Sequence, residues 1–167
     1  EYLYAVNLFS DEFYNDILNH LPPDKSFFHL IHPDAIIDRE KKISSRLHVD
    51  IKRLSDSPLW KRVNSILQSE ELKRVFLDKF KKTARTSECS MTSYLSRDKK
   101  QYKISPHADT PVKIITLIIY LPEDNSHEKL GTNILTGRQP KDFKLHKMAK
   151  FHRNSCIAFP VTKHSFH

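Results

Sequence analysis

The sequence predicts an α+β protein, with helices in the first half of the chain and short strands in the second. Two observations support this prediction. Apolar residues recur at helical spacing in three stretches before residue 88, and a nearly continuous β-branched run follows at 113–121. Helices followed by a group of short strands are typical of α+β proteins, in which the strands close into a sandwich or barrel.

The first predicted helix begins after Ser10, a suitable N-cap that Asp11 and Glu12 follow in the first turn. Pro22 and Pro23 end it, because proline cannot continue a helix. The expected apolar face consists of Phe13, Ile17, Leu18 and Leu21.

A second helix is expected to begin at Pro58, with Ser57 as its N-cap. Its expected apolar face consists of Leu59, Val63, Ile66 and Leu67, with Trp60 beside it. The expected face of a third helix consists of Leu72, Val75, Phe76 and Phe80. These stripes indicate packing surfaces, whereas residues 24–56 have weak periodicity and carry no assignment.

Four strands are predicted after residue 88. The strongest is Lys113–Leu121, whose continuous apolar character indicates cover on both faces. Weaker strands are expected at Cys89–Ser96, Gly131–Leu135 and Ser155–Val161.

Size and composition indicate one globular domain over residues 1–167, with helical support at about 1–87 and a strand core at about 88–167. Of the 167 residues, 38% are hydrophobic and 29% charged, which is a globular balance. The two glycines exclude a glycine-rich phosphate loop. No apolar run approaches the roughly 18–20 residues of a membrane span, so no membrane partner is expected. Cys89 and Cys156 lack CxxC spacing, which favours a reducing, cytoplasmic location.

The net charge of +8 favours anionic partners. Nucleic acid is one candidate, although no base-reading motif is present. Basic residues gather at 73–85 and at 138–153. A solvated basic face is the ordinary interpretation of both stretches.

The chemistry of the chain is indicated by His107 and Asp109. Residues two apart on an extended chain point to the same side, so both side chains can reach one metal ion. An HxD pair by itself is a weak signal, and a third ligand has to come from a distant strand. Two histidines and one carboxylate form the facial triad of non-haem Fe(II) oxygenases, which leaves coordination positions open.

The surroundings of this pair resemble the 2-oxoglutarate/Fe(II)-dependent dioxygenase superfamily, near its prolyl-hydroxylase-like branch. In that branch the HxD pair precedes a basic residue and a strand ending in Tyr-Leu, as in Lys113–Leu121. The family's next strand starts with Gly-Gly or Gly-Thr, matched by Gly131-Thr132. Its distal histidine follows Ser and an aromatic residue, as in Ser165-Phe166-His167. The resemblance covers about residues 88–167.

This resemblance implies a double-stranded β-helix, also called a jelly roll or cupin-like fold, with N-terminal supporting helices. It implies a dioxygenase with Fe(II), 2-oxoglutarate and O2, which hydroxylates a substrate and decarboxylates 2-oxoglutarate to succinate. His107, Asp109 and His167 would be the metal ligands and the catalytic centre. His164 competes with His167 for the third position, but only His167 matches the family motif.

The resemblance also implies residues that bind the 2-oxoglutarate. Tyr120 matches the position whose phenol bonds the far carboxylate, Thr116 is a lining candidate on the same strand face, and Tyr94 is a weaker candidate. Lys113 has the opposite strand parity from Tyr120 and is expected to face outward. The family places an Arg or Lys about one strand beyond the distal histidine, so we expect one or more C-terminal strands past His167.

Two other interpretations stay open at this point. One is a different cupin-like metalloenzyme, and the other is a non-catalytic basic module that binds nucleic acid or an acidic partner. The charge favours an anionic substrate, but the sequence does not identify it, because loops set substrate choice and the fold does not. Residues 124–130 and 138–153 are expected to border the mouth of the site.

Overall fold

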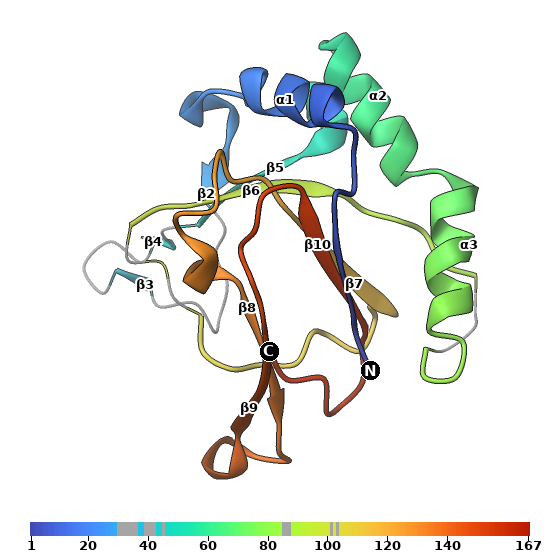
Figure 1. Ribbon diagram of the computed structural model, residues 1–167, viewed down its shortest axis with the longest axis vertical. Coiled ribbons are helices and arrows are strands. Elements are labelled where there is room, and N and C mark those ends of the chain that lie inside the picture. Colours follow the sequence, from blue (N-terminus) through green and yellow to red (C-terminus); the bar gives the residue numbers. More distant parts are fainter. Residues whose placement is uncertain (30–36, 39–42, 45, 85–87, 101, 103) are drawn as a thin grey trace. The chain divides into compact units, whose positions relative to one another are not determined.

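The computed structural model (Figure 1) describes residues 1–29, 37–38, 43–44, 46–84, 88–100, 102 and 104–167. Helices and antiparallel sheets are both present, which confirms the mixed α and β character that the sequence predicts. The chain divides into two compact units, neither of which is continuous in the sequence. The first unit comprises Glu1–Asn19, Arg74–Cys89 and Pro106–His167. The second unit comprises His20–Lys73 and Ser90–Ser105.

The main sheet of the first unit has β10 (Ser155–Pro160) at its centre, between β1 (Leu3–Val6) and β7 (Ile115–Tyr120) (Figure 1). Both pairings are antiparallel. All six residues of β10 are buried, and both of its edges are hydrogen-bonded to neighbouring strands. The predicted strands at Ser155–Val161 and Lys113–Leu121 are therefore confirmed. The second of these begins two residues later than expected, and most of β7 is half-buried.

A second ladder in this unit joins β8 (Thr132–Thr136) to β9 (Lys144–Ala149), again antiparallel. The strand predicted at Gly131–Leu135 is confirmed as β8, whereas β9 was not predicted. On the other edge of β8, the amide of Leu135 donates to the carbonyl of Phe166 at 3.0 Å. The end of the chain therefore runs beside β8.

A buried cluster links the two ladders of the first unit. Tyr120, Ile157 and Phe159 come from the main sheet, and Ala149 comes from β9. The partly buried residues packed against them are Tyr2, Tyr4, Ile118, Ile134 and Phe151. Ile157 and Ile118 are cross-strand partners, so one face of the main sheet supplies most of this cluster.

Asn154 fixes the N-terminal segment to the start of β10. It adopts the left-handed backbone conformation, with φ of 53°, which asparagine tolerates better than most residues. Its buried side chain accepts a hydrogen bond from the amide of Phe9 at 2.9 Å and donates to the carbonyl of Phe9 at 2.8 Å. Helix α1 (Asp11–Asn19) begins two residues after Phe9. In this helix the Tyr14 hydroxyl donates to the carbonyl of Pro122 at 2.7 Å.

All three predicted helices are present, as α1, α2 (Pro58–Leu67) and α3 (Glu70–Lys79). Their expected apolar faces were partly wrong. The buried residues are Tyr14 and Ile17 in α1, Trp60 and Val63 in α2, and Phe76 in α3, with Phe80 just beyond it. Ile66 and Val75, both expected to be buried, are exposed. Trp60, expected beside the face of α2, is buried at 3% exposure, and Tyr14, which the expected face of α1 did not include, is fully buried.

The sheet of the second unit has β5 (Arg46–Asp50) between β2 (Phe28–His29) and β6 (Tyr94–Asp98). Only the last part of the strand predicted at Cys89–Ser96 is confirmed, because β6 begins at Tyr94. Burial alternates along β5, so one face of this sheet is covered and the other is open. A short pair, β3 with β4, is formed by Ile37–Asp38 and Ile43–Ser44.

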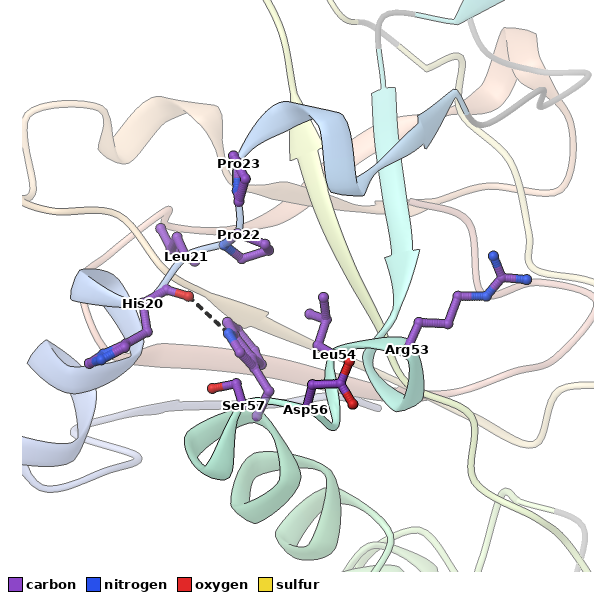
Figure 2. A pocket seen from close by; sticks show the side chains of 9 residues that line it. His20, Leu21, Pro22, Pro23, Arg53, Leu54, Asp56 and Ser57 are labelled. Atoms are coloured by element: carbon purple, nitrogen blue, oxygen red, sulfur yellow. Dashed lines mark hydrogen bonds between the residues drawn. The ribbon is translucent and has the colours of Figure 1, made fainter.

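A hollow of about 410 Å³ in the second unit lies beside Trp60, whose indole nitrogen donates to the carbonyl of His20 at 2.9 Å (Figure 2). The hydrogen bond ties the first turn of α2 to the chain at His20. The other lining residues are Leu21, Pro22, Pro23, Arg53, Leu54, Asp56 and Ser57.

Short 3-10 helices are formed by Asp24–Ser26, Ile51–Leu54, Glu128–Leu130 and Pro140–Asp142. Among the residues described, none of the helices combines the length and the apolar character that crossing a membrane requires.

Candidate metal centre

The centre is built on a reciprocal backbone contact between two distant parts of the first unit. The amide of His107 donates to the carbonyl of His167 at 3.1 Å, and the amide of His167 donates to the carbonyl of His107 at 3.0 Å. This exchange is the hydrogen-bonded pair of an antiparallel ladder, which places the two residues opposite each other. The imidazole rings lie with their centroids 4.5 Å apart.

Asp109 completes the group from the same segment as His107. One ligand nitrogen of each histidine and one carboxylate oxygen of Asp109 all lie within 4.8 Å of one another. Within the described part of the chain, this is the group of three or more such side chains that can hold a metal ion. The structure therefore brings together the three ligands that the sequence predicts.

Two neighbouring side chains hold the carboxylate of Asp109. The Thr116 hydroxyl donates to Oδ2 at 2.6 Å, and the ammonium group of Lys113 donates to Oδ1. Burial by itself raises the pKa of Asp109, but these two hydrogen bonds outweigh it, so the pKa is lowered below its ordinary value. Asp109 is thus ionised at neutral pH, the form that binds a cation.

His167 lies in a more apolar setting. Its ring packs against Phe159 at a centroid distance of 4.8 Å, and burial lowers its pKa despite a hydrogen bond to the Ser165 carbonyl. The imidazole is therefore neutral at physiological pH. Nδ1 lies 3.3 Å from that carbonyl. If Nδ1 carries the proton, Nε2 keeps the lone pair that a metal needs.

The alternative histidine does not join this group. His164 is exposed, and its amide donates to the Thr162 hydroxyl at 3.2 Å within the same turn. The backbone pairing with His107 places the His167 side chain beside those of His107 and Asp109. His164 lies three residues earlier, in an exposed turn.

Tyr120 and Thr116 lie on one face of β7, as expected. Thr116 is opposite Phe159 and Tyr120 is opposite Ser155, four residues further along the strand. That spacing corresponds to about 13 Å. The Tyr120 phenol is buried, donates to the Thr132 hydroxyl at 2.6 Å and accepts from the Thr132 amide at 3.0 Å. Its pKa is raised by burial, although the hydrogen bonds with Thr132 oppose the rise.

Tyr94 lies in the second unit. Its side chain is 58% exposed and stacks on His48, with ring centroids 5.7 Å apart. Thr116 is therefore a direct neighbour of Asp109 in the candidate metal centre, whereas the contacts of Tyr94 are made with His48 in the second unit.

Lys113 is exposed, as its predicted outward orientation implies, but its side chain contacts Asp109, and sequence reasoning missed this contact. The prediction applied strand parity to Lys113, but β7 begins only at Ile115. Lys113 instead closes a turn, in which its amide donates to the Thr110 carbonyl at 3.0 Å. The turn brings its side chain back to Asp109. The spacing of four residues between opposite charges was the signal available in the sequence.

No model of a protein family matches the chain, and no curated protein or solved structure matches it.

Proposed function

We propose that the chain is an Fe(II)- and 2-oxoglutarate-dependent oxygenase, a dioxygenase that hydroxylates its substrate. The observation that supports this most directly is the convergence of His107, Asp109 and His167, within 4.8 Å of one another. Two histidines and one carboxylate are the donor set of the Fe(II) facial triad.

The residues present fit a ferrous ion in three respects. The donors are two imidazole nitrogens and a carboxylate oxygen, a mixed set that suits iron. Asp109 is held in its ionised form and His167 in its neutral form, as ligation requires. The Ser165 carbonyl and the Thr116 hydroxyl contact the outer sides of two of these ligands and orient them.

When bound, ferrous iron with 2-oxoglutarate and O2 would supply the oxidising chemistry, with succinate and CO2 as the other products. The role of the protein is to hold the metal ligands in place and to limit the access of water to them. The three ligands are anchored by the His107–His167 backbone pair, which fixes the histidines relative to each other. Phe159 packs on His167 and limits the access of water from that side.

We propose Tyr120 and Thr116 as the residues that bind 2-oxoglutarate, while the role expected for Tyr94, which lies in the second unit, stays a prediction. Tyr120 is the stronger candidate, since its phenol is buried on the same strand face as Thr116. Its proton is engaged by Thr132. Binding of the far carboxylate would therefore require the hydroxyl to turn from Thr132 to the ligand.

We further propose that the first unit is the main part of a double-stranded β-helix. Two antiparallel ladders that share the cluster of Tyr120, Ala149, Ile157 and Phe159 support this fold. Neither Cys89 nor Cys156 is in a disulfide, which suits the reducing, cytoplasmic location that we propose.

The proposal is tested by anaerobic titration of the protein with Fe(II) and 2-oxoglutarate, watched for the visible metal-to-ligand charge-transfer band of the chelate. We expect the band in the parent protein and its loss in His107→Ala and His167→Ala. His164→Ala is the matched control, because it removes a nearby exposed imidazole that lies outside the group, and it should keep the band.

Two outcomes would contradict the proposal. If iron binds but no band forms, the site belongs to another cupin-like metalloenzyme, for example one that uses Zn²⁺ with the same ligand types. If His107→Ala and His167→Ala leave iron binding unchanged, the group is not a metal site, and the non-catalytic basic module becomes the better interpretation.

A further inference from the structure

The sheet of the second unit has one buried face and one open face. Leu47, Val49 and Leu95 are 3%, 2% and 8% exposed, so they form the covered side. The residues that alternate with them face the opposite way. These are Arg46, His48, Asp50, Tyr94, Ser96 and Asp98.

Two large aromatic side chains lie exposed beside β5. Phe28 is 55% exposed and Tyr94 is 58% exposed. Phe28 pairs with His48 on one edge of β5, and Tyr94 pairs with Asp50 on the other edge. Single exposed apolar residues are common, but two rings on one sheet face form a patch, and such patches mark interaction sites.

Each ring is held in place by a neighbour. Tyr94 stacks on His48 with an interplanar angle of 28°. The Arg53 guanidinium lies over Phe28, 5.2 Å from the ring centroid. Since these contacts orient the rings before any partner arrives, less conformational freedom is lost on binding.

The same side chains line a hollow of about 410 Å³, formed by Phe28, His48, Asp50, Arg53 and Tyr94. This volume is within the range of ligand sites. The hollow offers aromatic surfaces, one cation, and the hydrogen-bonding groups of His48 and Asp50. A planar base attached to a phosphate matches this combination.

We propose that this face binds single-stranded nucleic acid, with bases stacked on Phe28 and Tyr94 and a phosphate paired with Arg53. Exposed Lys52 lies next to Arg53 in the chain and adds positive charge. The net charge of +8 favours a polyanion over an isolated nucleotide. Asp50 repels phosphate, and its Oδ1 accepts a hydrogen bond from the amide of Lys52 at 2.9 Å, so its other oxygen, Oδ2, is the one that meets the amino groups of a base edge. Stacking of this kind tolerates many sequences.

The test uses the whole chain and fluorescence anisotropy with labelled oligo-dT and oligo-U of about 12 nucleotides, a length within the site sizes of stacking platforms. We expect binding that weakens as salt is raised. Phe28→Ala and Tyr94→Ala should each weaken it about five-fold or more, since stacking stabilises each base substantially. Tyr94→Phe should restore the affinity because it keeps the ring.

The charge contribution and the controls are measured in the same assay. Arg53→Ala should weaken binding and flatten its salt dependence. Leu145→Ala removes a side chain that is 60% exposed in the first unit, and it should leave binding unchanged. Circular dichroism melts check that each variant is folded, which is expected for substitutions of exposed side chains.

Four results would overturn the inference. The first is an absence of binding at low salt. The second is binding that is insensitive to both aromatic substitutions, and the third is binding as tight for UMP as for oligo-U. The fourth is loss of the 2-oxoglutarate chelate in Tyr94→Ala with oligonucleotide binding intact, which would assign Tyr94 to the cosubstrate. His107→Ala should keep oligonucleotide binding, so failure of the oxygenase proposal is distinguishable from failure of this one.

Discussion

Lys113 forms an ion pair with Asp109, and it does so from a turn in which the two residues are four positions apart. The lysine side chain is 49% exposed and the aspartate side chain 11% exposed, so the pair is open to solvent on the lysine side. The carboxylate that the proposed metal needs is therefore already neutralised by a cation of the chain. A divalent ion has to share or displace this contact.

We expect Lys113→Met to increase the affinity for divalent metal. A half-exposed ion pair contributes roughly 0.2–1 kcal/mol, which corresponds to an increase of up to about five-fold. The measurement is an anaerobic titration with Mn²⁺, followed by the loss of its free-ion EPR signal. Lys113→Arg keeps the charge and should stay near the parent. A weaker affinity in Lys113→Met would show that the lysine holds Asp109 in position.

Thr116→Val should weaken metal binding about ten-fold, because outer groups that orient ligands typically contribute ten- to hundred-fold to metal affinity. The substitution keeps the shape and removes the hydroxyl that donates to Asp109 at 2.6 Å. Thr132→Val is the matched control, since it removes the hydroxyl that bonds Tyr120 instead. Equal affinities in the two variants would contradict the role of Thr116.

Gly131→Ala should destabilise the fold by about 1–3 kcal/mol, the usual cost of overpacking. A Cβ atom at this position would lie 1.7 Å from the carbonyl oxygen of Ala149, which belongs to the paired strand β9. Urea denaturation measures the change. Asn133→Ala, at an exposed position on β8, should stay within about 0.5 kcal/mol of the parent. An unchanged midpoint for Gly131→Ala would mean that β8 and β9 are not packed so closely.

The two cysteines should differ in reactivity. Burial raises the pKa of the Cys156 thiol, and its side chain is 1% exposed at the centre of the main sheet. Since the thiolate is the reactive form, Cys156 should resist DTNB in the native protein and react after addition of urea. Cys89→Ser isolates this thiol, and Cys156→Ser isolates the half-buried Cys89, which should react sooner. Rapid labelling of Cys156 without urea would indicate that the sheet face carrying this side chain is not covered.

The helices show which local features a sequence reveals. Ser10 with Asp11 and Glu12, and Ser57 with Pro58, correctly predicted where α1 and α2 begin. The Ser10 hydroxyl accepts from the amide of Phe13 at 3.3 Å, whereas in α2 the Ser57 side chain forms no cap hydrogen bond and the local signal is Pro58 in the first turn. The buried faces were less accurate. Val75 is 55% exposed although it lies three residues after Leu72 in the expected apolar stripe, because what packs against a helix is decided by distant segments.

Among the strands, too, some could be predicted from local sequence and others could not. The β-branched run of β7 and the apolar residues of β10 identify both segments as strands by composition. Composition did not show that β10 is central and that β7 lies at an edge of the described sheet. In contrast, β9 carries four exposed residues at its start, and its sequence has no strand signal strong enough to stand out. Its pairing with β8 is a property of the folded chain.

The sequence by itself determined the ligand types of the candidate centre and the identity of the three residues. The HxD pair of His107 and Asp109 and the motif Ser165-Phe166-His167 are short local patterns, so they can be recognised without the fold. Only the tertiary structure decided that His107 and His167 exchange backbone hydrogen bonds, that Lys113 turns back to Asp109, and that Phe28 and Tyr94 share an open face. The physical reason is that register and turn geometry depend on pairing between residues far apart in the chain, which local spacing does not encode.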